Sequence, residues 1–291
     1  MAAGPQRCAM AVIEYDGTAF AGSQVQPNAR TVQGELEEAL NRLIGERTRV
    51  RLAGRTDAGV HATGQVAAFC LSRRGRDAET EWPALRRRLN AALPPDLAVR
   101  SLRTAPPGFD PRRDALWRVY RYRIRANGAR RPGDRHRTLE IDERLDVDAM
   151  RAAADRMVGE RDYASLGSDV HGRTVRHLAE VRVTRRGDLV EVRVTANAFL
   201  RRMVRSIVAV LLAAGRGRIA PDDVDRLLAG SGRALHGRAA PARGLTLERI
   251  VYPSADNRTN RTTPTNRTNR TIAPTALRGA AGGQQGKPES S

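Results

Sequence analysis

One short stretch of the chain has the composition of an active-site loop. Gly54 and Gly59 bracket an Arg-Thr-Asp-Ala segment whose acidic residue is Asp57. Glycines let a loop turn sharply and let another backbone approach closely, so such a loop can hold a carboxylate out from its scaffold. The same spacing also fits an ordinary aspartate turn ahead of a strand. The pattern alone leaves a catalytic and a structural interpretation of Asp57 open.

The charge of the chain indicates a polyanionic partner. Its 291 residues include 51 Lys and Arg against 32 Asp and Glu, a net charge of +19, and Lys287 is the only lysine. A GC-rich genome favours arginine over lysine, but it does not explain the surplus of basic over acidic residues. Because guanidinium groups bind phosphates in a bidentate manner, we expect an RNA partner. Four arginine clusters could contact its backbone or simply be solvated, at 86–88, 112–113, 130–131 and 185–186.

Several classes of protein are disfavoured. The two cysteines, Cys8 and Cys70, are too few for a disulfide framework or a four-ligand zinc site. The five histidines show no spacing that would select a metal, so we expect no metal site. Glu14 and Asp16 come before any long apolar run, unlike in a signal peptide. The most apolar segment, 199–214, is too short to span a bilayer. We expect a cytoplasmic protein with no membrane contact.

The elements that must position Asp57 alternate between strand-like and helix-like stretches, which indicates the α+β class. The apolar patterns predict strands at 9–15, 65–71, 117–125, 178–184, 189–195 and 245–251. They predict helices at 32–44 (capped by Thr31), 83–93, 147–158 and 199–214.

Composition divides the chain into three parts. Pro106-Pro107-Gly108 marks a join between an N-terminal half, 1–105, which carries the Asp57 loop, and a C-terminal half, 106–253. Residues 254–291 contain no aromatic residue and are rich in Asn, Arg and Thr. We predict that this last part is a disordered tail.

Residues 54–62, Gly-Arg-Thr-Asp-Ala-Gly-Val-His-Ala, resemble the active-site motif of the A-type tRNA pseudouridine synthases, which modify the anticodon stem-loop. A single nine-residue match could arise by chance, but further blocks follow in the family's order over about residues 9–253. They are Tyr15-Asp16-Gly17, Phe109-Asp110-Pro111-Arg112, Tyr120-Arg121-Tyr122, the run Ala-Asn-Ala-Phe-Leu-Arg-Arg-Met-Val-Arg at 196–205, and Gly244-Leu245.

The resemblance implies a fold and an activity. The fold is α+β, with two similar halves whose antiparallel strands join in a central sheet, helices on the outer face and an active-site cleft between the halves. The activity is the isomerisation of uridine to pseudouridine at positions 38, 39 and 40 of tRNA. The family needs no cofactor and works as a cytoplasmic homodimer, with one tRNA reaching across both subunits.

The resemblance also implies roles for five residues. Asp57 is the catalytic carboxylate, Tyr120 is the active-site tyrosine and Arg205 pairs with the carboxylate. Arg55 helps to hold the nucleotide out of its stack, and Leu245 packs in the pocket. The chain departs from the family at Ser23, where a tryptophan is usual, and at Leu166, where a phenylalanine is common. We expect these departures to affect RNA docking rather than chemistry.

Three mechanistic questions stay open at this stage. Asp57 could attack C1′ of the ribose or C6 of the base, or assist elimination at the sugar. Tyr120 could remove the C5 proton, or stack on the uracil and form a hydrogen bond, which we favour. Arg55 could fill the space that a flipped base leaves, or contact a phosphate.

Two other functions fit the sequence less well. A non-catalytic tRNA-binding protein on the same fold would be expected to lack Asp57 or its arginine partner, and both are present. A nuclease or glycosidase generally needs a second catalytic carboxylate or a metal, and the blocks supply one acid.

Overall fold

The computed structural model describes residues 7–72, 81–169, 172–230 and 239–253. The tail that we predict to be disordered, 254–291, lies outside these residues, as do His171 and His236. Residues Met1–Pro253 form one unit by their contacts. The boundary that we predict between residues 105 and 106 falls in the connection between two of its strands.

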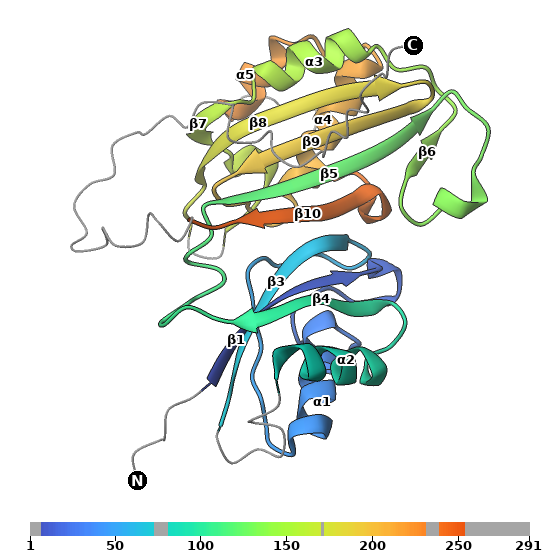
Figure 1. Ribbon diagram of the computed structural model, residues 1–291. Helices are drawn as coiled ribbons and strands as arrows, with labels where there is room; N and C mark the ends of the chain where they lie inside the picture. Colours follow the sequence, from blue (N-terminus) through green and yellow to red (C-terminus); the bar gives the residue numbers. More distant parts are fainter. Residues whose placement is uncertain (1–6, 73–80, 170–171, 231–238, 254–291) are drawn as a thin grey trace, which may run out of the picture. The chain divides into compact units, whose positions relative to one another are not determined.

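A mixed β-sheet runs through the described part of the chain (Figure 1). Its central path has the order β4-β1-β3-β10-β5-β9-β8-β7, while β2 pairs with β3 and β6 pairs with β5. The strands are β1 (Arg7–Tyr15), β2 (Arg51–Leu52), β3 (His61–Leu71), β4 (Leu97–Thr104), β5 (Trp117–Ala126), β6 (Leu139–Ile141), β7 (Gly159–Asp162), β8 (Val175–Arg186), β9 (Leu189–Ala196) and β10 (Leu245–Val251).

Strand β10 joins the strands of the two halves. It runs parallel to β3, with Thr246 opposite His61 and Leu247 opposite Ala62, and antiparallel to β5. The α+β class and the central sheet are therefore as expected, but the sheet is mixed rather than antiparallel, because β3–β10 and β5–β6 are parallel pairs. Parallel strands need a long connection between them, and here β10 follows the strands of the C-terminal half and returns to pair with β3 of the N-terminal half.

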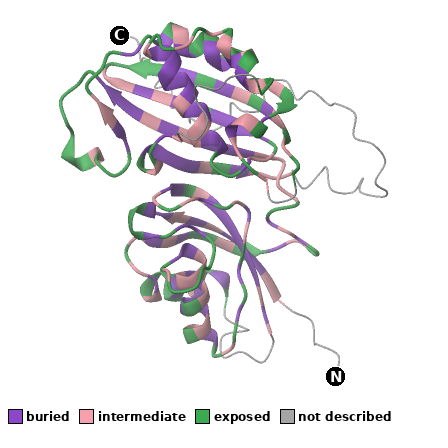
Figure 2. Cartoon of the chain, turned by 180° about the vertical axis from the view of Figure 1, so that it is seen from behind, coloured by how far each residue is buried: buried purple, intermediate pink, exposed green. Residues whose placement is uncertain are grey.

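Five α-helices of the described residues pack in two groups (Figure 1). Helices α1 (Val32–Ile44) and α2 (Trp82–Ala92) lie beside the N-terminal strands, and α3 (Val147–Asp155), α4 (Met203–Gly215) and α5 (Asp223–Leu228) lie beside the C-terminal ones. Short 3-10 helices are η1 (Gly17–Ala19), η2 (Pro132–Asp134), η3 (Ala164–Leu166) and η5 (Ala242–Gly244). Buried residues follow the strands and the inner helix faces (Figure 2). None of the helices described is long and apolar enough to cross a membrane.

Helix α1 begins where its sequence predicts. The hydroxyl of Thr31 accepts a hydrogen bond from the Gly34 N–H at 3.2 Å, which satisfies one free donor of the first turn. Val32, Leu36 and Leu40 are buried on one face. This face packs into the hydrophobic core, which holds the helix in place.

Helix α4 begins four residues later than predicted. The pattern placed its start at Phe199, but the helix starts at Met203. Arg202 has a left-handed backbone, with φ of 64°, and the Arg201 N–H bonds to the Ser168 carbonyl at 3.0 Å. This bridge holds 199–202 outside the helix, so the apolar spacing around Phe199 reflects packing rather than helical structure.

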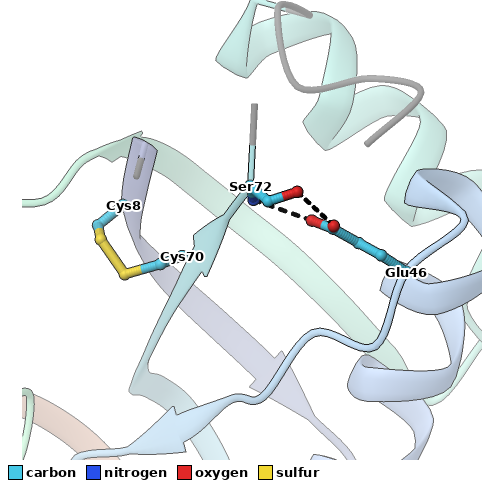
Figure 3. The surroundings of a disulfide bond; sticks show 4 residues. All are labelled: Cys8, Glu46, Cys70 and Ser72. Atoms are coloured by element: carbon cyan, nitrogen blue, oxygen red, sulfur yellow. Dashed lines mark hydrogen bonds between the residues drawn. A yellow bond between two sulfur atoms is a disulfide. The ribbon is translucent and has the colours of Figure 1, made fainter. Parts of the chain in front are cut away.

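The two cysteines form one disulfide (Figure 3). Cys8 in β1 and Cys70 in β3 are direct partners in the antiparallel register. Just after β3, the chain is held to the segment that follows α1, because the Ser72 N–H bonds to the Glu46 carboxylate at 2.9 Å. Two cysteines do not make a framework, but this single bond links two neighbouring strands.

Candidate active site

The loop that carries Asp57 leaves β2 and enters β3. Its first residues are tied to β3, because the Ala53 N–H bonds to the Val66 carbonyl at 2.9 Å. The side-chain amide of buried Gln65 then binds both sides of Gly54: Nε2 donates to the carbonyl at 2.8 Å, and Oε1 accepts from the N–H at 3.2 Å. The start of the loop is therefore fixed by main-chain contacts rather than by its own side chains.

The middle of the loop is held at Thr56. The Tyr15 hydroxyl lies 2.8 Å from the Thr56 hydroxyl, so the first strand contacts the side chain. Ser23 contacts the main chain of Thr56 on both sides, at 2.8 and 3.1 Å. All three residues are buried. Burial raises the pKa of Tyr15 to about 12, so its hydroxyl keeps its proton.

The loop closes with a tight turn after Asp57. The Val60 N–H bonds to the Asp57 carbonyl at 3.2 Å, and Gly59 has a left-handed backbone with φ of 77°. A side-chain carbon on Gly59 would lie 3.2 Å from the Cβ atom of Ala242. A glycine is therefore needed here both for its conformation and for the close approach of the η5 segment.

Asp57 is paired with Arg205. An oxygen of the carboxylate lies 3.0 Å from Nη1 of the guanidinium, and the two side chains are 29% and 18% exposed. Arg205 comes from the first turn of α4, and its Nε donates to the Ala240 carbonyl at 2.6 Å. The Ala240 N–H returns a bond to the Arg205 carbonyl at 3.0 Å. The guanidinium is thus fixed before it reaches Asp57, and the carboxylate keeps access to solvent.

Tyr120 stands beside this pair on β5. Its ring is buried and meets Phe199 edge-on, with centroids 5.2 Å apart. A side-chain carbon built on Gly54 would lie 3.9 Å from the Tyr120 hydroxyl, which places that hydroxyl next to the loop. Burial raises the pKa of Tyr120 above its ordinary value, and the charge of Asp57 adds to the rise. The phenol therefore holds its proton.

The other two candidate residues lie at different depths. Arg55 is exposed and makes no ion pair with a described residue, so its guanidinium is available to a ligand. Leu245 is buried on β10, opposite Tyr122. Sequence reasoning missed Leu247, which lies two residues after Leu245 on β10 and pairs with Tyr120 of β5. A side-chain carbon built on Gly54 would lie 3.9 Å from Cδ2 of Leu247. Because alternate residues of a strand share a face, Leu245 could have pointed to it.

The structure brings Asp57, Arg205 and Tyr120 together and leaves Arg55 at the surface beside them. Sequence reasoning missed Ala240, which orients Arg205, and Phe199, which supports Tyr120. It also missed the contacts of Ser23, whose burial no local pattern signals. Among the described residues no group of three or more His, Cys, Asp or Glu could hold a metal ion. The site is a carboxylate with a fixed cation and a buried aromatic ring.

Comparison with known proteins finds relatives by sequence and neighbours among solved structures. A family described as tRNA pseudouridine synthase matches residues 11–112 and 153–253. The tRNA pseudouridine synthase A of Chloroflexus aurantiacus is 46% identical over 251 residues, which cover 83% of this chain and 87% of that protein. The protein of the same name from Geobacter sulfurreducens is 41% identical over 83% of this chain and 98% of its own length. Among solved structures, a Cbf5-Nop10-Gar1 complex matches with 12% identity and a TM-score of 0.29, over 73% of this chain and 56% of that one.

Proposed function

The chain belongs to the tRNA pseudouridine synthase family, and from this we infer that it converts uridine into pseudouridine in tRNA. The reaction breaks the bond between N1 of the base and C1′ of the ribose and joins C1′ to C5. C5 loses a proton and N1 gains one, so the composition and oxidation level of the nucleotide do not change. The activity is that of an isomerase.

The pairing of Asp57 with Arg205 is the observation that supports our assignment of the site. The carboxylate belongs to a loop of the first half, and the guanidinium to a helix of the second. A carboxylate can act as a nucleophile at C1′ or C6, or assist loss of the base, and each route requires its charged form. The guanidinium contacts one carboxylate oxygen, and the other has no hydrogen bond to a described residue, so it can meet the nucleotide.

We propose that Tyr120 contacts the base. A buried ring opposite Leu247 offers a flat apolar surface on which a uracil can stack. Because its pKa is raised, the Tyr120 hydroxyl acts as a hydrogen-bond donor in the free protein. To take the C5 proton, it would first have to lose its own. Stacking with a hydrogen bond is therefore the role that the site favours.

Arg55 suits the step that exposes the nucleotide. A base within an RNA helix must leave its stack before it can reach a carboxylate on a protein, which costs a few kcal/mol. The exposed guanidinium of Arg55 is two residues from Asp57 and is planar, so it can take the place of the base in the stack. Contact with a phosphate is the alternative role.

By resemblance to the family, we propose that the targets are positions 38, 39 and 40 of the anticodon stem-loop. We also propose that the protein is a cytoplasmic homodimer and that Leu245 lines the base pocket. Chemical mapping of pseudouridine in tRNA treated with the protein tests the positions, and analytical ultracentrifugation tests the dimer.

Release of tritium from tRNA labelled at C5 of its uridines tests the reaction and the role of Asp57. We expect release by the wild type, and loss of release with retained tRNA affinity for Asp57→Asn, because the change removes charge but not shape. Asp148→Asn is the matched control, since its side chain is 89% exposed on α3. Full activity of Asp57→Asn would refute the assignment of the site. Tight tRNA binding with no tritium release by either the wild type or Asp57→Asn would indicate a tRNA-binding protein.

A further inference from the structure

Ser23 is anchored to the start of helix α1. It is fully buried between η1 and α1, and its carbonyl accepts a hydrogen bond from the Gln33 N–H at 2.9 Å. The carbonyl of Gly22, just before it, accepts from the Val32 N–H at 3.3 Å. These N–H groups belong to the first turn of the helix, where no intrahelical partner exists. Ser23 is therefore held by main-chain hydrogen bonds to the first turn of α1.

From this base, Ser23 makes two bonds to one residue of the Asp57 loop. Its Oγ accepts from the Thr56 N–H at 2.8 Å, and its own N–H donates to the Thr56 carbonyl at 3.1 Å. The Thr56 N–H belongs to the peptide that follows Arg55, and the carbonyl to the peptide that precedes Asp57. Ser23 thus fixes both peptide planes, and with them the directions in which the side chains of Arg55 and Asp57 leave the loop.

We propose that Ser23 is a positioning residue for the isomerisation and acts on Asp57 through Thr56. The proposal rests on the role proposed above for Asp57. The contact depends on a short distance between two backbones: Gly22 has φ of 119°, and a side-chain carbon there would lie 3.1 Å from the Thr56 carbonyl oxygen. At this distance a serine hydroxyl reaches the N–H directly. An indole, the side chain usual here in the family, has a donor but no acceptor and cannot make this bond.

Removal of the hydroxyl should loosen the loop without unfolding the protein. In Ser23→Ala the buried Thr56 N–H loses the partner that the structure gives it, whereas the hydroxyl of Tyr15 still holds the Thr56 side chain. The bond from the Ser23 N–H also remains. Displacement of a catalytic group by about 1 Å can cost on the order of a hundredfold in rate. We expect the single-turnover rate of Ser23→Ala to fall roughly tenfold to a hundredfold.

The test compares three variants in single-turnover tritium release and in equilibrium binding of tRNA. Ser23→Ala removes the hydroxyl, and Ser23→Thr keeps it. Thr31→Ala is the matched control, because it also deletes a buried hydroxyl that accepts a main-chain N–H bond near the start of α1, but one without contact to the loop. Thermal unfolding gives the stability of each variant, and hydrogen exchange of the peptide over residues 53–60 gives the protection of the Thr56 N–H.

The proposal is supported if Ser23→Ala loses rate while its tRNA affinity stays within about twofold of the wild type. Ser23→Thr should recover the rate. Thr31→Ala should react at a near-normal rate at a similar melting temperature. Faster exchange over 53–60 in Ser23→Ala should accompany the rate loss. The proposal is overturned if Ser23→Ala keeps the wild-type rate, if Thr31→Ala loses as much, or if exchange over 53–60 does not change. An inactive wild type would instead refute the proposed function, and exchange would still test the contact.

Discussion

Loss of the Arg205 guanidinium should slow the chemical step more than it weakens RNA binding. Arg205→Ala removes the charge 3.0 Å from the Asp57 carboxylate and leaves that carboxylate with water as its partner. Two unit charges about 4 Å apart interact by about 1 kcal/mol in water and about 4 kcal/mol at the effective dielectric near a protein surface. Asp57 and Arg205 are 29% and 18% exposed, so an intermediate value of about 2 kcal/mol applies, which is roughly thirtyfold in rate.

The assay is single-turnover tritium release with saturating enzyme, beside a separate titration of tRNA binding. Arg205→Lys keeps the positive charge but loses the planar group that contacts both Ala240 and Asp57, so we expect it to recover only part of the rate. Arg218→Ala is the matched control for net charge, because Arg218 is an exposed arginine just beyond the C-terminal end of α4. A variant Arg205→Ala that binds tRNA more weakly but reacts at the wild-type rate would refute the reasoning.

Two further predictions concern stability. Burial outweighs the attraction of Asp16 and lowers the pKa of His61 below its ordinary value of 6.5. The unfolded chain therefore binds a proton at His61 more readily than the folded chain does. The unfolding free energy should fall as pH drops below about 6.5. Urea unfolding at a series of pH values should show this fall in the wild type and a smaller one in His61→Gln, and equal slopes would assign the effect to another group. The Cys8–Cys70 bond spans 62 residues of sequence, for which chain entropy gives a contribution of about 4 kcal/mol. Thiol titration and melting with and without reductant should show that reduction frees two thiols and lowers the melting temperature. A double serine variant, insensitive to reductant, is the control, and an unchanged melting temperature of the reduced wild type would contradict the bond.

Local patterns predicted the elements well where side-chain periodicity and end signals agree. Strand β10 has the predicted bounds, and α1 follows its Thr31 cap. The predicted start of α4 was wrong, because a tertiary contact, the bridge between Ser168 and Arg201, overrides the helical spacing of the apolar residues. Strand β4 was missed, because much of it is exposed or half-buried at the edge of the sheet and shows little apolar alternation. The parallel pairing of β10 with β3 joins segments too far apart in sequence for periodicity to reveal.

The candidate site divides in the same way. The acidic loop could be identified from its glycines, but the resemblance to a family was needed to select Tyr120 and Arg205 among many aromatic and basic residues. Asp57 is partly exposed, with 29% of its side chain open to solvent, and the loop pattern gave no measure of this. The groups that orient the site act largely through main-chain atoms: the Ala240 carbonyl holds Arg205, and Ser23 holds the Thr56 peptides. Main-chain groups carry no sequence signature, so this layer of the site is visible only in the fold.

Arg118 explains how distant motifs meet in one place. Its guanidinium is buried, and the hydrogen bonds that it makes with described residues all go to carbonyl oxygens, including those of Ala53, Arg112 and Asn197. Burial lowers the pKa of Arg118, and these dipoles take the place of a carboxylate partner. Ala53 precedes the Asp57 loop, Arg112 ends the block at the mid-chain join, and Asn197 lies in the block that leads to Arg205. Because the guanidinium is a rigid planar fork, it sets these three segments at fixed distances from one another, and the carboxylate and its cation can meet although 148 residues separate them in sequence.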